Sequence, residues 1–402
     1  MKTIVFIGMN KSGSSREAAR AAEALGYFTV LLTNNERQTL QRHEYPDIHK
    51  MQLVDTLDFP AMREEIQTLQ TLGFAIRQIV SFVDPYVQIA SKLCDEFCEN
   101  HLSTKAIAIM EDKEKTRLFL QGEPYSPTFQ LITPDDHLPS SSTFPMIVKS
   151  PKSTGSKDAL LAKNKATLKK AVHTLRQKYP TEAILLEEYV LGPQYLIEVM
   201  VENGKPHLLA IIKQDITKGK RFIITGYRVL ADAPAPIKES LESLCAALVQ
   251  KFELTTGYFH VELRHTKRGW KLIEMNPRIS GGAMNRMLEA AFGFNTVREI
   301  LKLYVGETPD ITPRTQHFVY TKYLIVRRKG ILQRVTGKMR AHNTPGIYDV
   351  YVKPKKGTLL IPPLSMGHRY AYVIARGDSE RTAVKLAESA AREIRFWLRK
   401  VR

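Results

Sequence analysis

The chain has 402 residues, of which 43% are hydrophobic and 25% are charged, and this composition is that of a globular protein with apolar residues for more than one core. Three cysteines are too few for a disulfide framework, and no apolar run approaches the roughly 18 residues needed to cross a bilayer, so we expect a cytoplasmic protein without a membrane partner. The net charge of +18 is scattered along the chain, which favours small anionic substrates over nucleic acid.

The N-terminal part of the chain alternates between apolar strands and helices. Strands are expected at residues 3–7, 28–32 and 76–83, and helices at residues 16–25, 60–72 and 84–100. This alternation predicts a parallel sheet with helices on its faces, so residues 1–105 are expected to form a Rossmann-like domain of the α/β class. Ligands of such a domain bind at the carboxyl ends of its strands.

Two local features of this domain have alternative interpretations. The loop between Gly8 and Gly13 lacks the glycine spacing of a dinucleotide fingerprint, so its backbone amides either hold an anion or only make a turn. Cys94, Cys98 and His101 recur on one face of a helix at a spacing that suits a metal. No fourth ligand lies nearby in the sequence, and we therefore interpret these three as residues of a packed helix face.

From about residue 106 the pattern changes to α+β. Helices are expected at residues 111–121, 165–179, 236–252 and 380–401, strands at residues 146–149, 183–188, 195–202 and 207–213, and a glycine/serine loop at residues 150–157. We expect a central domain of residues 106–310, with a subdomain at about 145–190. A small C-terminal α+β domain of residues 311–402 is expected to follow.

Residues 257–264 and 270–278 alternate as the two strands of a hairpin do. A three-residue connection, with Gly269 in the left-handed position of a bulge, pairs Thr266 with Trp270, Arg264 with Leu272, and Glu262 with Glu274. Two carboxylates directly opposite each other repel. The sheet therefore keeps this pair only if positive charge lies between them.

Asn276 and Arg278 follow Glu274 at alternate positions, which places all three on one face of the strand. Carboxylate and amide oxygens are hard ligands, suited to Mg²⁺ that also holds substrate phosphates. The alternative is a solvent-facing hairpin whose glutamates are neutralised by arginine. The apolar residues that flank Glu274 favour a buried strand and hence the metal site.

These residues resemble the metal-binding signature of the ATP-grasp superfamily. Three more stretches resemble its other motifs in the same order: Glu111-Asp112-Lys113 with Arg117 its early helix, residues 144–156 its strand, lysine and phosphate loop, and residues 184–190 its adenine-reading hinge. Together these motifs cover residues 111–282. Ser150-Pro151 departs from the pattern, because many members have proline directly after the lysine.

The resemblance implies a ligase that uses ATP and two Mg²⁺ ions, with Mn²⁺ as an alternative metal. The residues that it implies for ATP binding are Lys113, Lys149, Ser153, Gly155, Ser156, Glu187, Glu188, Val190 and Glu198. Glu262, Glu274 and Asn276 are implied to hold the metal ions. Arg278 is implied to be the catalytic residue that stabilises the transferring phosphoryl group.

Residues 280–286 resemble the bacterial L-amino-acid ligases, which make dipeptides from two unprotected amino acids through an aminoacyl phosphate. With residues 258–262 they are most similar to methionine-preferring members, which implies an apolar first and a small second amino acid. The implied substrate-binding residues are His260, Gly281, Gly282, Arg286 and Pro85. His260 and Arg286 are equally well interpreted as a strand histidine and a helix-surface charge.

Asp84 and Pro85 also have two interpretations. As N-cap and first helical residue they are completely explained as a helix start. In a parallel sheet, however, they follow a strand at the ligand crevice. The resemblance places this crevice at the amino-acid end of the site, where the Pro85 ring would limit the size of the amine-donating amino acid.

Three other functions stay open at this point. They are another ATP-grasp carboxylate–amine ligase, a carboxylase-like subunit acting on bicarbonate, and a nucleotide-binding regulatory protein without catalysis. The intact set of Glu262, Glu274, Asn276 and Arg278 argues against the last. We expect ATP and amino acids as partners, neither nucleic acid nor membrane, and leave a homodimer open.

Overall fold

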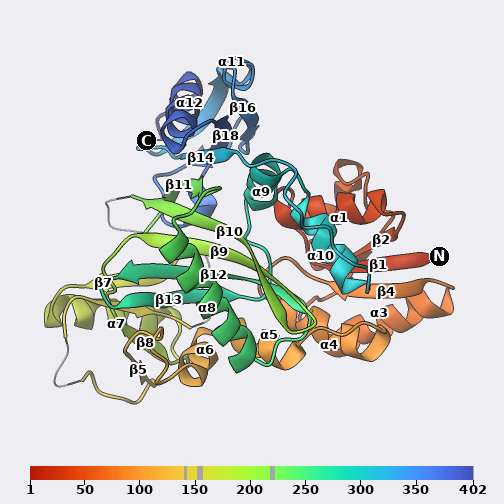
Figure 1. Cartoon of the computed structure of the whole chain (residues 1–402), viewed down its shortest axis with the longest axis horizontal. Helices are drawn as coiled ribbons and strands as arrows, with labels where there is room; N and C mark the ends of the chain where they lie inside the picture. The colour runs from red at the N-terminus through yellow and green to blue at the C-terminus, as the bar shows by residue number, and fades with distance from the viewer. Residues whose placement is uncertain (140–142, 152–156, 218–221, 402) are drawn as a thin grey trace.

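The computed structural model describes residues 1–139, 143–151, 157–217 and 222–401. Within these residues the strands form a parallel four-stranded sheet, an antiparallel four-stranded sheet, an eight-stranded sheet and a three-stranded sheet (Figure 1). No helix among them is long and apolar enough to span a membrane. The mixed α/β architecture is the one predicted.

The N-terminal sheet is parallel throughout, in the order β3 (Lys50–Leu53), β2 (Phe28–Thr33), β1 (Lys2–Ile7) and β4 (Ala75–Val80). Side chains of β1 alternate between its two faces, because successive residues of a strand point in opposite directions. Ile4 and Phe6 pack with α1 (Ser14–Ala24), whereas Val5 and Ile7 pack with α3 (Phe59–Thr71) and α4 (Val87–Phe97). Both faces are covered by helices, as expected for a Rossmann-like sheet.

The start of α4 differs from the prediction. The helix begins at Val87, and Tyr86 rather than Asp84 occupies the N-cap position. Asp84 and Pro85 lie in the turn before it, because the Asp84 carboxylate binds Arg278 of the central domain instead of capping backbone amides. The interpretation of these residues as N-cap and first helical residue is therefore wrong.

The cysteines of α4 belong to the core. Cys94 and Cys98 are buried beneath the N-terminal sheet, and the ring of His101 bonds to the carbonyl oxygen of Cys98 at 2.9 Å. Among the described residues no group of three His, Cys, Asp or Glu side chains could hold a metal ion. The interpretation as packed residues is therefore correct for Cys94 and Cys98, but His101 is exposed, and both it and Cys98 lie beyond the end of α4 at Phe97.

The four-stranded antiparallel sheet has the order β5 (Phe129–Ile132), β8 (Ile184–Glu188), β6 (Met146–Lys149) and β7 (Ala159–Ala162). α7 (Lys165–Lys178) covers it, and its Leu168 and Val172 pack against Val148 and Leu186. The charged helix expected at residues 111–121 is the shorter α6 (Lys113–Phe119), and a separate helix, α5 (Thr104–Met110), precedes it. α6 begins after Asp112, whose side chain caps it.

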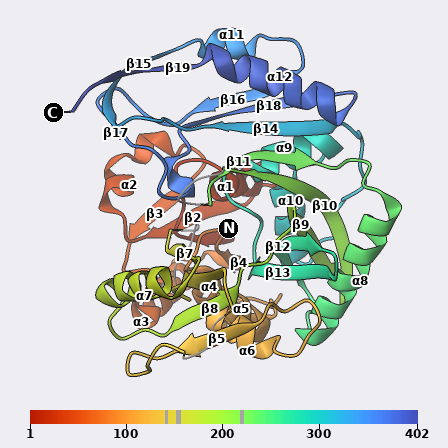
Figure 2. The same cartoon turned by 90° about the vertical axis from the view of Figure 1, so that its left-hand side faces the viewer.

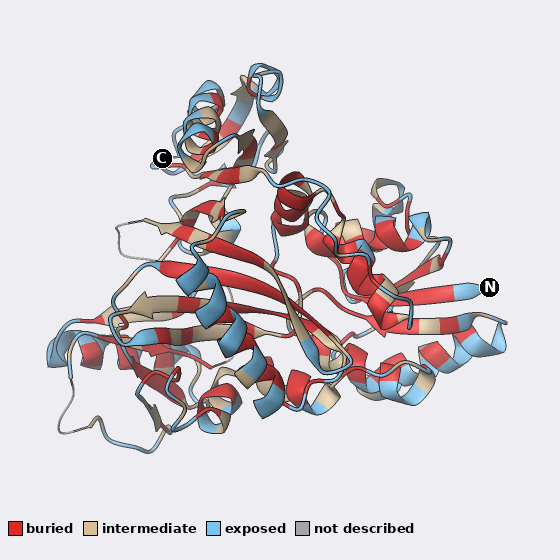
Figure 3. Ribbon diagram, in the orientation of Figure 1, coloured by how far each residue is buried: buried red, intermediate tan, exposed pale blue. Residues whose placement is uncertain are grey.

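The eight-stranded sheet forms the centre of the molecule. Its order is β13 (Gly269–Asn276), β12 (Gly257–Thr266), β9 (Gln194–Glu202), β10 (Lys205–Ile216), β11 (Ile224–Val229), β14 (Phe318–Leu324), β18 (Ala371–Gly377) and β16 (Ile347–Val352). Figure 3 shows that β9 and β12 are largely buried. The sheet continues across residue 311, so the predicted C-terminal domain begins on the same sheet as the central domain.

Helices cover both faces of this sheet. α8 (Ala235–Lys251) packs on one face with Val199 and Val201, whereas α9 (Met284–Phe292) and α10 (Thr296–Tyr304) pack on the other with Leu196 and Met200. α9 and α10 also contact α1, which joins the central sheet to the N-terminal domain. Figure 2 shows the strands β14, β16 and β18 above the N-terminal domain, with the antiparallel β5–β8 region below it.

The C-terminal helix is shorter than predicted. α12 (Glu380–Glu393) packs on β14 and β18, and the chain then forms β19 (Arg395–Arg399) beside β15 (Gly330–Thr336), which also pairs with β17 (Leu359–Leu360). Phe396 and Leu398 alternate toward an apolar core that contains Leu332. The helix predicted to reach residue 401 is therefore wrong beyond Glu393, because this alternation suits a strand better than a helix.

The hairpin register is right at the glutamates and wrong at the turn. Glu262 lies opposite Glu274 as predicted, but Thr266 pairs with Gly269, and Arg264 pairs with Lys271. The connection therefore has two residues between the paired positions, and a bulge between Glu262 and Leu263 restores the predicted pairing. The pairs expected for Thr266 with Trp270 and for Arg264 with Leu272 do not form.

Candidate active site

The two facing glutamates are in different electrostatic states. Burial and the charge of Glu274 raise the pKa of Glu262 to about 7. Burial alone would raise the pKa of Glu274 as well, but the positive charges of Lys113 and Lys149 outweigh it and lower that pKa. Lys113 Nζ lies 3.2 Å from Glu274 Oε1. The positive charge that the sequence required is thus supplied from one side of the pair.

The Glu262 carboxylate accepts hydrogen bonds from two side-chain amides. Gln194 Nε2 donates to one oxygen of Glu262 at 3.2 Å, and Gln214 Nε2 donates to the other at 3.4 Å. Because neither amide carries a positive charge, a bound cation would stabilise the ionised form of the Glu262 carboxylate. Carboxylate oxygens in this state are suited to a divalent metal ion.

Asn276 is oriented by His260. Burial and the charge of Arg278 lower the pKa of His260 to about 4, so its ring is neutral. His260 Nδ1 lies 2.7 Å from the carbonyl oxygen of Arg278 and donates to it, which leaves Nε2 to accept from Asn276 Nδ2 at 3.2 Å. The amide oxygen of Asn276 is then turned away from the ring and is available to a metal ion beside Glu262 and Glu274. This donor set fits Mg²⁺.

Arg278 is held by a carboxylate of the N-terminal domain. Its Nε donates to Asp84 Oδ1 at 2.7 Å and its Nη2 to Asp84 Oδ2, while Nη1 donates to the carbonyl oxygen of Ile279 at 2.9 Å. Burial would raise the pKa of Asp84, but the Arg278 charge outweighs it and lowers that pKa. These bonds fix the plane of the guanidinium and leave part of its fork of donors for a substrate oxygen.

A first pocket, of about 100 Å³, lies between the antiparallel β5–β8 sheet and the β12–β13 hairpin. It gathers five of the residues that the resemblance implied for ATP: Lys113, Lys149, Glu187, Glu188 and Val190. Ile147 and Tyr189, which lie within the predicted motifs, also line it, and so do residues that were not predicted, among them Gln194, Phe222, Arg264 and Ile273. Ser153, Gly155 and Ser156 lie outside the described residues.

Within this pocket the Glu187 side chain is engaged by protein partners. Arg117 Nε lies 2.5 Å from Glu187 Oε1, and Lys149 Nζ lies 2.7 Å from Glu187 Oε2. Arg117 also donates to the carbonyl oxygen of Ile273 at 2.6 Å. Glu187 therefore positions Lys149 and, through Arg117, connects β8 to β13. Because both of its carboxylate oxygens are engaged, only the backbone of Glu187 is left for the predicted adenine contact. The Glu188 carboxylate likewise accepts from the Thr128 amide at 2.8 Å.

Three predicted site residues lie elsewhere. Glu198 is fully buried opposite His260 and accepts from the Ser280 amide at 3.1 Å. Glu198 and Gln194 are on the same face of β9, and Gln194 lines the pocket. Glu198 is four positions farther along the strand, which places it roughly 13 Å from Gln194. Arg286 pairs with Glu289 at 2.9 Å, and neither it nor Pro85 is among the described residues that line the two pockets of this site.

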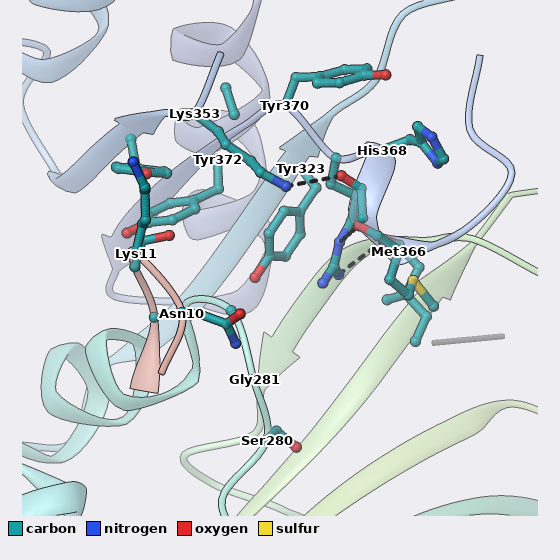
Figure 4. Close-up of a pocket in the computed structure, with 18 of the residues that line it drawn as sticks. Asn10, Lys11, Ser280, Gly281, Tyr323, Lys353, Met366, His368, Tyr370 and Tyr372 are labelled. Atoms are coloured by element: carbon teal, nitrogen blue, oxygen red, sulfur yellow. Dashed lines mark hydrogen bonds between the residues drawn. The ribbon is translucent and has the colours of Figure 1, made fainter. Parts of the chain in front are cut away.

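A second, larger cavity of about 990 Å³ adjoins the first pocket. One wall carries Asp84, His260, Glu262, Glu274, Asn276, Arg278, Ser280, Gly281 and Gly282. Residues 10–13 of the N-terminal domain form a second wall, and a third comes from the C-terminal strands and the loops between them, with Tyr323, Lys353, Met366, His368, Arg369 and Tyr372 (Figure 4). Sequence analysis predicted none of the third wall.

The loop between Gly8 and Gly13 packs on the turn that follows Arg278. A Cβ atom on Gly13 would lie 2.7 Å from the carbonyl oxygen of Gly282, and Ser14 Oγ donates to the carbonyl oxygen of Ser280 at 2.9 Å. Only glycine fits at this approach. The loop therefore contributes to the shape of the cavity through its backbone.

Two family models match the chain. Residues 142–286 match the ATP-grasp domain, and residues 322–399 match the L-amino acid ligase C-terminal domain 2. The first match contains the Glu262–Arg278 hairpin, and the second contains the cavity wall that sequence analysis missed.

Solved structures share the whole fold. The L-amino acid ligase from Bacillus licheniformis aligns with a TM-score of 0.85 and 18% identity, covering 100% of this chain and 99% of that one. The N5-carboxyaminoimidazole ribonucleotide synthetase from Thermotoga maritima aligns with a TM-score of 0.70 and 17% identity, covering 99% of both chains.

Curated relatives are distant. An uncharacterized protein of Sinorhizobium fredii is 25% identical over 356 residues, which are 85% of this chain and 72% of that protein. The L-arginine-specific L-amino acid ligase of Bacillus subtilis is 21% identical over 255 residues, which are 61% of each chain. The chain thus spans less than two thirds of that ligase.

We predict that Glu187→Gln destabilises the fold by about 3–5 kcal/mol, because it leaves the buried cations Arg117 and Lys149 without their counter-charge. The free energy of unfolding in urea at pH 7 measures this loss. The neighbouring exposed Glu188→Gln is the matched control and should change little. Equal small effects of both substitutions would show that the Glu187 carboxylate is not the centre of this network.

Glu198 predicts a pH dependence. Burial raises its pKa from the ordinary value of 4.5 to about 8, so in this window the folded chain keeps a proton that the unfolded chain has lost. The free energy of unfolding then falls with rising pH, by up to about 1.4 kcal/mol per unit.

Glu198→Gln should remove this contribution, so that the variant gains stability over the parent as pH rises from 5.5 to 7.5, as measured by urea unfolding at several pH values. Glu202→Gln, at a half-exposed position of the same strand, is the control. Parallel pH profiles of Glu198→Gln and the parent would contradict a protonated Glu198.

Proposed function

Because this chain is an ATP-grasp carboxylate–amine ligase with the C-terminal domain of the L-amino acid ligases, we propose that it joins two unprotected L-amino acids into a dipeptide. ATP is converted to ADP and phosphate, and the first amino acid is activated as an aminoacyl phosphate. The similarity to the two L-amino acid ligases from Bacillus supports this choice within the ATP-grasp ligases.

One observation carries the proposal: Glu262 and Glu274 line both the small pocket and the large cavity. Lys113 and Lys149 lie on the pocket side of this junction, and Arg278 lies on the cavity side. A nucleotide in the pocket would place its terminal phosphate at the junction. A carboxylate in the cavity would meet it there, between cations on both sides.

The chemistry proceeds in two displacements. A carboxylate oxygen of the first amino acid attacks the γ-phosphorus of ATP, and the bond from that phosphorus to ADP breaks, with its electron pair leaving on ADP. The amine of the second amino acid then attacks the acyl carbon. Phosphate departs with the former carboxylate oxygen, and the amine loses its proton to solvent.

The protein contributes position and charge to these steps. Lys113 and Lys149 offset phosphate charge on the nucleotide side, and a divalent metal ion held by Glu262, Glu274 and Asn276 would neutralise further charge on the phosphates. Arg278, kept in one plane by Asp84, faces the oxygens of the transferring group from the other side. Its interaction strengthens as charge spreads over those oxygens in the transition state.

The lining of the large cavity supports a choice of amino-acid substrates. Leu196 and Ile224 form an apolar part of the cavity wall on the same sheet as His260 and Glu262. This supports an apolar first amino acid such as methionine, with a small amino acid as the second. The binding role of Pro85 is replaced in this proposal by that of Asp84, which lines the cavity.

ADP release with single amino acids, with all pairs of amino acids, and with bicarbonate tests the proposed function. We expect release to rise well above the single-substrate rates only with particular pairs, with dipeptide formed in step with ADP. Release that depends on bicarbonate, or on a single amino acid together with an amine that is not an amino acid, would favour the alternative ligases and contradict the proposal.

We predict that Asp84→Asn and Arg278→Lys each lower kcat at least tenfold with little change in the KM for ATP. Lysine keeps the charge but loses the planar fork, and asparagine leaves the guanidinium without its two-pronged carboxylate partner. Steady-state kinetics with the best amino-acid pair provide both parameters.

Because both substitutions disturb one contact, their effects on kcat should be strongly non-additive in the double variant. Asp58→Asn, which alters only the N-cap of α3, is a control for general effects of losing a carboxylate. Additive effects, or a rise in the KM for ATP that matches the loss of kcat, would show that Asp84 does not act through Arg278.

A further inference from the structure

Arg369 lies in the third wall of the large cavity, and no carboxylate of the described residues forms an ion pair with it. Its guanidinium carbon stacks 3.9 Å from the centre of the Tyr323 ring, Nε donates to the carbonyl oxygen of Met366 at 3.2 Å, and Nη1 donates to that of Ile224 at 3.4 Å. In the described part of the chain, therefore, carbonyl oxygens and tyrosine rings hold this charge in place, and no carboxylate forms an ion pair with it. A stacked arginine held in this way is preorganised for an anion.

A second cation stands beside it. Lys353, directly after β16, donates to the carbonyl oxygen of Gly367 at 3.2 Å, and Figure 4 shows it on the same side of the cavity as Tyr323 and Met366. Burial lowers the pKa of Lys353, and the charge of Arg369 lowers it further. Two positive groups that disfavour each other in this way would both be stabilised by an anion between them.

The cavity also contains cations that already have partners. Lys11 lies 3.2 Å from Glu44, and Lys355 lies 3.3 Å from the other oxygen of the same carboxylate. Arg278 is paired with Asp84. Lys11, Lys355 and Arg278 therefore form ion pairs with carboxylates, whereas Arg369 and Lys353 are held by carbonyl oxygens.

Arg369 is also close to the reaction centre. A Cβ atom on Gly282 would lie 3.6 Å from Arg369 Nη2 and 3.1 Å from the Tyr323 hydroxyl, and the Ala283 amide donates to that hydroxyl at 3.2 Å. The turn that contains Gly282 begins directly after Arg278. Glu262 lies near enough to act on the pKa of Arg369. A small molecule can therefore reach from one wall to the other.

The cations of the two walls differ in their pairing. At the reaction centre, Arg278 is paired with Asp84 and Lys113 with Glu274, whereas Arg369 and Lys353 on the facing wall form no ion pair with a described carboxylate. A free amino acid is a zwitterion, so its own carboxylate is attracted to Arg369 and Lys353. Its amino group then extends across the cavity toward the reaction centre, where the acyl carbon is proposed to form.

We propose that Arg369, together with Lys353, binds the α-carboxylate of the amine-donating amino acid. The inference rests on the proposed function for the identity of that substrate. The chain then selects free amino acids over their amides and esters as amine donors. Arg369 is a specificity-determining residue at the acceptor end of the cavity, and the C-terminal domain supplies it.

The test uses the full chain with the best amino-acid pair and compares the amine donor with its carboxamide, for example glycine with glycinamide. The parent should prefer the free acid by at least tenfold in kcat/KM, in line with a charge-assisted contact. Arg369→Gln should lower kcat/KM for the acid at least tenfold, change that for the amide less than threefold, and leave the KM for ATP within twofold. Lys353→Met should act in the same direction.

Two further variants complete the comparison. Arg369→Lys keeps the charge but not the fork, and it should retain an intermediate preference if Arg369→Gln does not fold. Arg340→Gln removes an exposed arginine that pairs with Glu393 on the C-terminal domain and should behave as the parent. An acid-to-amide preference that is the same in the parent and in both Arg369 variants would overturn the proposal.

A binding measurement separates this inference from the proposed function. Calorimetric titration of the chain with glycine and glycinamide, in the presence of ADP and Mg²⁺, requires no turnover. If no amino-acid pair gives ADP release but glycine binds the parent more tightly than Arg369→Gln, the proposed function is wrong and the carboxylate site stands. If turnover occurs but neither kinetics nor binding responds to Arg369→Gln, the function stands and the site is wrong. If neither turnover nor a difference in glycine binding is found, both are wrong.

Discussion

Two carboxylates that directly face each other across one hairpin determine what the surrounding structure must supply. Glu262 and Glu274 repel unless positive charge lies beside them, and the chain meets this requirement unequally, with Lys113 on Glu274 and neutral amides on Glu262. Burial and the charge of Glu274 together raise the pKa of Glu262 to about 7. Because the two glutamates carry more negative charge than their neighbours neutralise, the site is suited to a cation. The glutamates line both pockets, and we propose phosphate transfer at this junction.

The same junction brings three parts of the chain together. The antiparallel sheet contributes Lys149, fixed by the buried Glu187, and the N-terminal domain contributes Asp84, which fixes Arg278. The loop before β18 contributes Arg369, which stacks on Tyr323. Each of these charged groups is held by a partner other than substrate, so the site is ordered before substrates bind. Such preorganisation is the main way in which a protein can assist a reaction whose covalent chemistry belongs to ATP and the amino acids.

Sequence reasoning succeeded where the physics is local. The facing of Glu262 and Glu274 was predicted from strand periodicity, and it was correct because a bulge between Glu262 and Leu263 offsets the turn, which is shorter than predicted. Asp84 was misinterpreted as an N-cap because the Asp-Pro pattern of a helix start is the same whether the carboxylate caps the helix or binds an arginine far away in the sequence. The position of Glu198 along β9, and the whole wall that contains Arg369, depend on packing between segments far apart in the chain, and no short-range pattern in the sequence reports it. The terminal helix was overextended because β19 owes its strand form to pairing with β15.

The central claim is that a carboxylate in the large cavity is activated by the phosphate of a nucleotide in the small pocket. Labelling the carboxylate of the first amino acid with ¹⁸O and analysing the released phosphate by mass spectrometry tests this claim directly. The account predicts that ¹⁸O appears in the phosphate, in step with dipeptide formation, because the oxygen that attacks ATP leaves with the phosphate. Unlabelled phosphate released alongside dipeptide would contradict it.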